Sequence, residues 1–128
     1  MTAIAKISLA ALFTVGAVGA AALPAAARDG ADGKPLKCIN LMSMGQTPVI
    51  NDRTILIEMK TGPGKYKRMD LAGPCNGIEY KGFAHQTGYN ELCTSDTLTS
   101  LGTPGAVCKI KDISDISDSE AKDLLKKK

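Results

Sequence analysis

The sequence predicts a mainly β fold: a small antiparallel barrel or sandwich with a short C-terminal helix, cross-linked by two disulfides. Short segments rich in β-branched residues recur at roughly ten-residue spacing, with glycine or proline between them. The chain also has four cysteines, an even number that is typical of disulfide pairing in small exported proteins. A Ser-x-x-Glu sequence near the C-terminus is typical of a helix start.

Residues 1–27 are predicted to be a cleavable signal peptide. Lys6 provides a positive charge, Ile7–Leu23 is apolar, and Ala25-Ala26-Ala27 offers small residues before a cut. A transmembrane anchor is disfavoured because an apolar run of about 17 residues is at the lower limit for spanning a bilayer. We therefore expect a periplasmic or secreted protein with no stable membrane insertion after cleavage.

Composition restricts the function classes that remain. The 101 residues after the leader suffice for one small domain and include 11 glycines and 5 prolines, which excludes a multidomain enzyme, a coiled coil and a polytopic membrane protein. Without Lys6, 15 basic side chains stand against 13 acidic ones. So small a net charge does not predict nucleic acid as a partner.

The cysteines are expected to form two disulfides. Cys38, Cys75, Cys93 and Cys108 all follow the leader, and no pair has the C-x2-C spacing of a zinc site. Four cysteines allow three pairings. The nested one, Cys38–Cys108 with Cys75–Cys93, is favoured because its outer bond would tie the first strand to the last.

The N-terminal part of the mature chain is expected to be an arm followed by a strand. Residues 28–35 are polar, contain two glycines and are predicted to be a flexible arm. The disulfide-linked β domain is expected over residues 36–116, beginning with a short strand at Leu36–Leu41. Asn51-Asp52 signals a turn before the next strand.

The clearest element is a hairpin of Thr54–Lys60 and Tyr66–Leu71, with the glycine-rich turn between them. Its register is predicted from side-chain matching. If Ile57 faces Met69, apolar side chains share one surface, whereas a shift of one residue would place Ile57 opposite Arg68. The first register is therefore expected.

Four more strands are predicted after the hairpin. Ile78–Ala84 alternates loosely and is expected to be a strand, with Tyr89–Cys93 as its partner. Thr97–Leu101 and Ala106–Lys111 flank Gly-Thr-Pro-Gly, which indicates a further hairpin.

Residues 117–128 are predicted to be a C-terminal helix with a basic tail. Ser117 and Glu120 match a capping box, and acidic residues open the segment while lysines close it. The apolar face, with Leu124 and Leu125, is narrow. We therefore expect this helix to dock only weakly.

The candidates for chemistry are few. His85 is the only histidine and lies in a predicted turn, while the chain lacks a Gly-x-Ser-x-Gly nucleophile elbow. Met42 and Met44 form a Met-x-Met pair that could hold Cu(I), but methionines more often fill irregular core gaps. Asp96 follows Cys93 by three residues and is expected to cap a tight turn. We therefore predict no catalytic, cofactor-binding or metal-binding residue.

Several of these positions together resemble a family of small exported proteobacterial domains to which no function is assigned. The resemblance covers residues 38–113. Its matching points are Cys38-Ile39, Asp52 before Ile55-Leu56-Ile57, Leu71 with Cys75, Leu92-Cys93-x-x-Asp96, and Cys108 before an apolar strand. Lys37 stands where that family often has arginine, which keeps the charge. The resemblance implies an exported, disulfide-linked, mostly β domain and supplies no catalytic residue or ligand.

Two functions from different classes follow as expectations. The first is a non-catalytic periplasmic module that binds or supports another component of the cell envelope. The alternative is a small metal-handling protein or hydrolase that uses His85 with Asp96 or with the Met42–Met44 pair.

Overall fold

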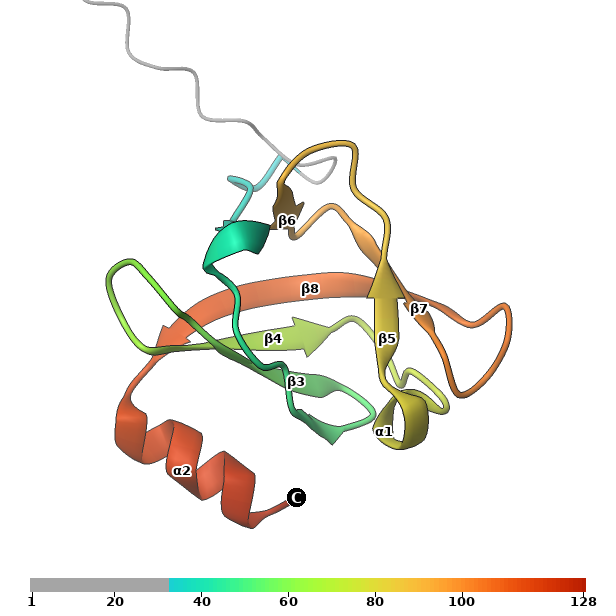
Figure 1. The fold of residues 1–128 in the computed structure, drawn as a ribbon. Helices are drawn as coiled ribbons and strands as arrows, with labels where there is room; N and C mark the ends of the chain where they lie inside the picture. The colour runs from blue at the N-terminus through green and yellow to red at the C-terminus, as the bar shows by residue number, and fades with distance from the viewer. Residues whose placement is uncertain (1–32) are drawn as a thin grey trace, which may run out of the picture.

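The structure is a computed structural model that describes residues 33–128 (Figure 1). The predicted signal peptide, residues 1–27, and most of the predicted arm lie outside the described residues. The elements in chain order are β1 (Cys38–Asn40), a 3-10 turn η1 (Leu41–Ser43), β2 (Val49–Asn51), β3 (Thr54–Glu58), β4 (Tyr66–Leu71), α1 (Ile78–Lys81), β5 (Phe83–His85), β6 (Glu91–Cys93), β7 (Thr97–Ser100), β8 (Val107–Ile116) and α2 (Asp118–Lys126).

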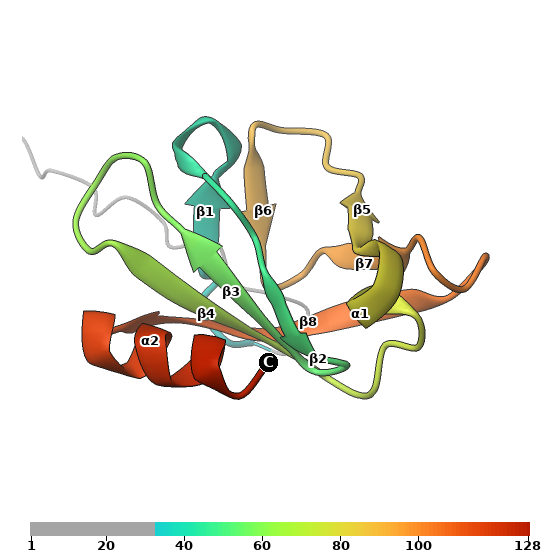
Figure 2. The same ribbon diagram turned by 60° about the horizontal axis from the view of Figure 1, so that its bottom comes forward.

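Six strands form one antiparallel sheet in the order β2-β3-β4-β8-β7-β5, and β1 pairs with β6 in a separate two-stranded sheet. The large sheet curls into a half-barrel, with the long β8 running across it (Figures 1 and 2). The mainly β prediction is confirmed, together with the C-terminal helix and two disulfides. The sheet is neither closed nor doubled, because β2 and β5 remain its two edges.

A β-bulge in β8 accompanies this curl. Leu71 pairs with Ile110 while Asp70 pairs with Asp112, so Lys111 is an extra residue on β8. A bulge bends its strand and increases the local twist. The bend comes between the half of β8 that pairs with β4 and the half that pairs with β7. The same extra residue lets Ile110 and Ile113, three positions apart, both be buried.

The core fills the concave face of the half-barrel. Its buried members are spread between β1 and β8: Ile39, Ile55, Ile57, Met69, Leu71, Cys75, Ile78, Leu92, Leu98, Cys108, Ile110 and Ile113. Because β1 and β6 contribute Ile39 and Leu92, the small sheet covers one end of this core.

Helix α2 covers the opposite face of the sheet, against β3 and β4 (Figures 1 and 2). Its Ala121 is fully buried with Leu56 in a second cluster. The Ser117 hydroxyl accepts a hydrogen bond from the Glu120 backbone N–H at 3.2 Å, as the capping box predicts. Ala121 is the one buried residue of this helix, so its contact with the sheet is narrow, and the expectation that it docks only weakly stays a prediction.

The disulfide pairing differs from the nested prediction. Cys38 is bonded to Cys93 and Cys75 to Cys108, so Cys38–Cys108 and Cys75–Cys93 are wrong. The first bond joins directly opposite residues of β1 and β6. The first strand pairs with β6 rather than with the last strand, and this removes the basis of the prediction.

The hairpin register is also corrected. Ile55 pairs with Met69 and Ile57 with Lys67, which is a shift of two residues from the expected Ile57–Met69 pair. A shift of two keeps every side chain on its predicted face. The apolar surface of β3 and β4 therefore faces the core as expected, although its partners differ.

The predicted strand Ile78–Ala84 is wrong in its first half. Residues 78–81 form the short helix α1, and only Phe83–His85 is a strand, paired with β7. Gly77 before the helix and Gly82 after it have φ of +82° and +77°, which only glycine adopts readily. These two glycines set a helical turn that is too short to show a periodic pattern. The predicted partner Tyr89–Cys93 pairs with β1 instead, as β6.

Candidate functional site

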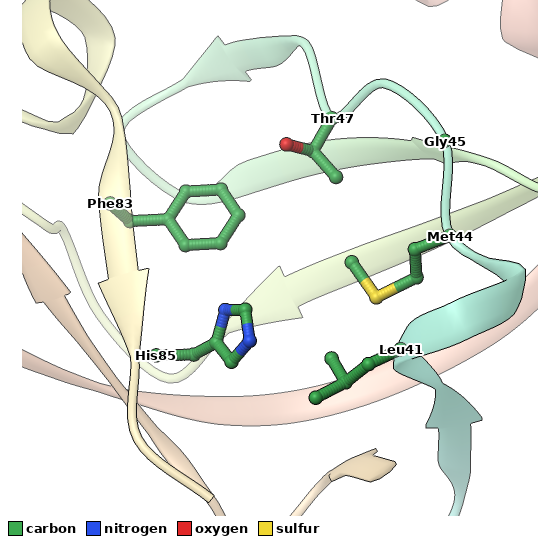
Figure 3. A pocket seen from close by; sticks show the side chains of 6 residues that line it. All are labelled: Leu41, Met44, Gly45, Thr47, Phe83 and His85. Atoms are coloured by element: carbon green, nitrogen blue, oxygen red, sulfur yellow. The ribbon is translucent and has the colours of Figure 1, made fainter. Parts of the chain in front are cut away.

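A pocket of about 280 Å³ opens at the concave side of the half-barrel (Figure 3). Two segments about forty residues apart in sequence form it: the chain that leads into β2, and strand β5. Its lining residues are Leu41, Met44, Gly45, Thr47, Phe83 and His85. The two segments belong to opposite edges of the sheet.

The lining of the pocket combines apolar and polar side chains. Leu41, Met44 and Phe83 are partly buried and pack against the main core. The Thr47 hydroxyl and the His85 imidazole supply the polar side-chain groups, and Figure 3 shows both side chains directed toward the pocket. Such a combination of apolar wall and a few polar groups is typical of binding sites.

Local interactions hold the first wall of the pocket, residues 41–47, against β3. The Asn40 side chain caps η1 by accepting a hydrogen bond from the Met42 N–H at 2.8 Å. Gly45 then donates its N–H to the Glu58 carbonyl at 2.6 Å. A Cβ at position 45 would lie 3.1 Å from that carbonyl oxygen, so glycine allows the close approach.

Pairing with β7 orients the second wall of the pocket, which is strand β5. Phe83 lies opposite Ser100, and His85 lies opposite Leu98. Both partners are buried in the half-barrel. Because paired residues of an antiparallel sheet share a face, the Phe83 and His85 side chains also point to the concave side.

The structure brings two of the sequence candidates together. His85 lies on a strand rather than in the predicted turn, and it lines the same pocket as Met44. Met42 is 77% exposed and does not line it. Asp96 has the structural role that was predicted, because its carboxylate accepts a hydrogen bond from the Cys93 N–H at 2.7 Å. Phe83 and Thr47 were not singled out from the sequence.

The ligand groups of Cys38, Cys93 and Glu91 lie within 4.8 Å of one another. Metal ions bind cysteine as thiolate, and both sulfurs are occupied by the Cys38–Cys93 disulfide. The oxidised protein therefore offers only the Glu91 carboxylate from this group.

One carboxyl group has a shifted pKa. A 2.7 Å hydrogen bond from the Lys37 ammonium lowers the pKa of Asp112, partial burial opposes the shift, and the positive charge of Lys37 adds to it. Neither residue lines the pocket. This pair links the segment before β1 to β8.

The chain was compared with protein families, curated proteins and solved structures. No family model, curated protein or solved structure matches the chain. Between residues 33 and 128 the structure has no helix that is long and apolar enough to cross a membrane.

Proposed function

We propose that the protein is a non-catalytic binding module that is exported to the periplasm or secreted. One observation carries this proposal: the pocket between the two edges of the half-barrel, which combines apolar side chains packed on the core with the Thr47 hydroxyl and the His85 imidazole. Its partner would be a component of the cell envelope.

The lining of the pocket supports binding rather than catalysis. A Ser-His-Asp type of site needs a carboxylate to orient the imidazole and a nucleophile beside it. The six lining residues include one hydroxyl, that of Thr47, and no carboxylate. All four cysteines are in disulfides, so no thiol nucleophile is available in the oxidised protein.

Two features support export. Disulfides persist in oxidising compartments and are rare in the cytosol. The apolar N-terminal segment that ends in Ala25-Ala26-Ala27 has the order that a signal peptidase recognises. Mass spectrometry of the protein from a periplasmic extract would test this part, and a chain that still begins at Met1 would contradict it.

Binding is tested by nuclear magnetic resonance of the methyl groups. Small apolar probes, such as indole and cyclohexanol, should shift the methyl resonances of Leu41 and Met44. Val107, which is 63% exposed and does not line the pocket, is the matched control and should not respond. If no probe shifts Leu41 and Met44, or if Val107 responds equally, the pocket is not a binding site.

Copper handling is a second candidate, favoured by one specific observation. The Met44 thioether and the His85 imidazole line the same pocket, and both groups suit Cu(I). The geometry thus joins two residues that are forty-one positions apart in the sequence.

A competition titration with a Cu(I) chelator tests this candidate, with ascorbate present to keep the copper reduced. Met44→Leu and His85→Ala should each weaken Cu(I) binding about tenfold or more. Met42→Leu is the matched control because Met42 lies outside the pocket. Equal Cu(I) affinity in the wild-type protein and the three variants would contradict copper handling.

A further inference from the structure

Strand β5 is an edge of the large sheet, and within residues 33–128 no strand pairs with its outer side. The Ser100 N–H donates to the Ala106 carbonyl, so the peptide groups of Ser100 point toward β8 rather than toward β5. In an antiparallel sheet, residues alternate between hydrogen-bonded and non-hydrogen-bonded pairs. Phe83 and His85 therefore form non-hydrogen-bonded pairs with β7, and their N–H and C=O groups point away from it.

On the opposite wall of the pocket, the backbone groups of Thr47 also point away from the neighbouring strand. The Gln46 carbonyl accepts from the Glu58 N–H at 2.9 Å, and the Pro48 carbonyl accepts from the Leu56 N–H at 3.0 Å. By the same alternation, the N–H and C=O of Thr47 point away from β3. Within residues 33–128, no hydrogen bond beyond the sheet ladders reaches the backbone of Thr47, Phe83 or His85.

The pocket thus lies between unpaired backbone groups, and its size restricts what enters it. Its volume of about 280 Å³ lies near the lower end of the range of about 300–1,000 Å³ that is typical of ligand pockets. A single apolar side chain of a larger partner suits such a space. The N–H and C=O groups at alternate positions of β5 match the hydrogen-bonding pattern of another extended chain.

We propose that the partner of this module is an extended peptide segment that adds a strand to the free edge of β5. Its backbone pairs with the N–H and C=O groups of Phe83 and His85, and one apolar side chain enters the pocket over Met44 and Leu41. This inference rests on the proposed function, because it names the partner class for the same pocket.

The experiment uses the oxidised protein and a panel of acetylated, amidated heptapeptides. The parent peptide is Thr-Lys-Thr-Leu-Thr-Lys-Thr, and further members replace leucine by valine, phenylalanine or glycine. Binding is followed by backbone amide resonances and by hydrogen exchange. A member with an apolar central residue should bind more tightly than about 1 mM, the weak end of specific binding. It should slow exchange of the Phe83 and His85 amides, and the glycine member should bind more weakly.

Two controls separate strand addition from apolar contact alone. A peptide N-methylated at every internal amide keeps its side chains but loses its donors, and it should not bind. His85→Pro removes the outward N–H at a position where an edge strand tolerates proline, whereas His85→Ala removes only the imidazole. His85→Pro should bind the peptide about tenfold more weakly than His85→Ala, as expected for the loss of one hydrogen bond.

The outcomes distinguish this inference from the proposed function. If small probes shift Leu41 and Met44 but no peptide of the panel binds, or if the N-methylated peptide binds as well as its parent, strand addition is wrong and the pocket remains a binding site. If neither probes nor peptides bind, both proposals fail. Should His85→Pro not fold, the N-methylated peptide still decides the question.

Discussion

Asp112 is linked to a defined partner in a distant segment of the chain. Its carboxylate accepts the hydrogen bond of Lys37, which precedes β1, and the interaction lowers the pKa of Asp112. The two side chains are 41% and 53% exposed, so water and salt screen the pair. Exposed pairs of this kind contribute about 0.2–1 kcal/mol to the free energy of unfolding.

The contribution of this pair should depend on pH with a definite sign. Because the folded state lowers the pKa of Asp112, the stabilisation is present above the ordinary value of 3.8 and is lost as pH falls through the lower folded value. Asp112→Asn should therefore reduce the free energy of unfolding by less than about 1 kcal/mol at pH 7 and have no effect at strongly acidic pH.

Denaturant titrations at the two pH values measure this effect. Lys37→Met and the double variant complete a mutant cycle, which isolates the interaction between the two side chains. A coupling energy that stays the same at strongly acidic pH would contradict the assignment.

Individual side chains were predictable from sequence only where their role is local. Asp96 caps a turn three residues away, and the spacing itself indicates that role. His85 and Met44 line the same pocket only because two distant segments of the chain curl toward each other. The sequence around His85 carries no signal for that meeting, and for the same reason Phe83 and Thr47 were missed.

At the scale of elements, a close contact between two glycines joins the start of α1 to the β7–β8 hairpin. A Cβ added to Gly102 would lie 2.1 Å from the Gly77 carbonyl oxygen, closer than atoms can approach. Gly77 also has a φ of +82°. This contact positions α1, and α1 leads directly into β5 and one wall of the pocket.

Gly102→Ala should therefore destabilise the protein by about 1–3 kcal/mol, the usual cost of overpacking a tight contact. Gly88→Ala is the matched control, since a Cβ at position 88 meets nothing within 4 Å. It should change the free energy of unfolding by less than about 0.5 kcal/mol. Thermal or denaturant unfolding of both variants provides the comparison, and equal stabilities would show that the contact relaxes freely.

Strand positions and faces were more predictable than their pairing. The β4 bounds, Tyr66–Leu71, agree with the expectation because alternation defines a strand by itself. A shift of two residues leaves that alternation unchanged, so side-chain matching could not choose the observed register. The sequence favours a strand at residues 78–81, where the structure has a helix, because four residues are too few to show helical periodicity.

At the scale of the whole molecule, the two disulfides differ in exposure. Cys75 is completely buried and Cys108 is 8% exposed, whereas Cys38 is on the surface. The chain-entropy relation gives about 4.2 kcal/mol for a loop of the Cys38–Cys93 length and about 3.8 kcal/mol for Cys75–Cys108. The loops overlap, so these two values do not add.

Limited reduction should therefore open Cys38–Cys93 first, because a reductant must reach the sulfur that it attacks. Full reduction should lower the melting temperature by more than about 10 °C, at about 4–8 °C per kcal/mol for a domain near this size. Peptide mapping of alkylated cysteines identifies the order, and circular dichroism gives the melting temperature. A shift of one or two degrees would mean that the core alone maintains the fold.

Helix α2 should unfold together with the sheet in the same melt. The helix lies outside both disulfide loops, so reduction does not act on it directly. The burial of Ala121 against Leu56 couples it to the sheet, so far-UV and tertiary signals should change at one temperature. Helical signal that persists after loss of the tertiary signal would contradict this coupling.

The fold class could be predicted because it depends on alternation, turns and cysteine number, which are properties of short segments. The pairing of cysteines could not, because it depends on which strands become neighbours. Cys38 meets Cys93 only because β1 pairs with β6 outside the large sheet.

The overlap of the two disulfide loops has a consequence for the biogenesis of an exported chain. On the proposed export route the chain would emerge from the translocation channel N-terminus first, and Cys38 and Cys75 would be the first two thiols to appear. They are not native partners. An oxidase that joins thiols as they emerge would therefore create a wrong bond, which only thiolate exchange can reverse. Cys38 can pair correctly only once Cys93 has emerged, and Cys75 only once Cys108 has, so a disulfide isomerase, rather than an oxidase alone, would limit the yield of native protein.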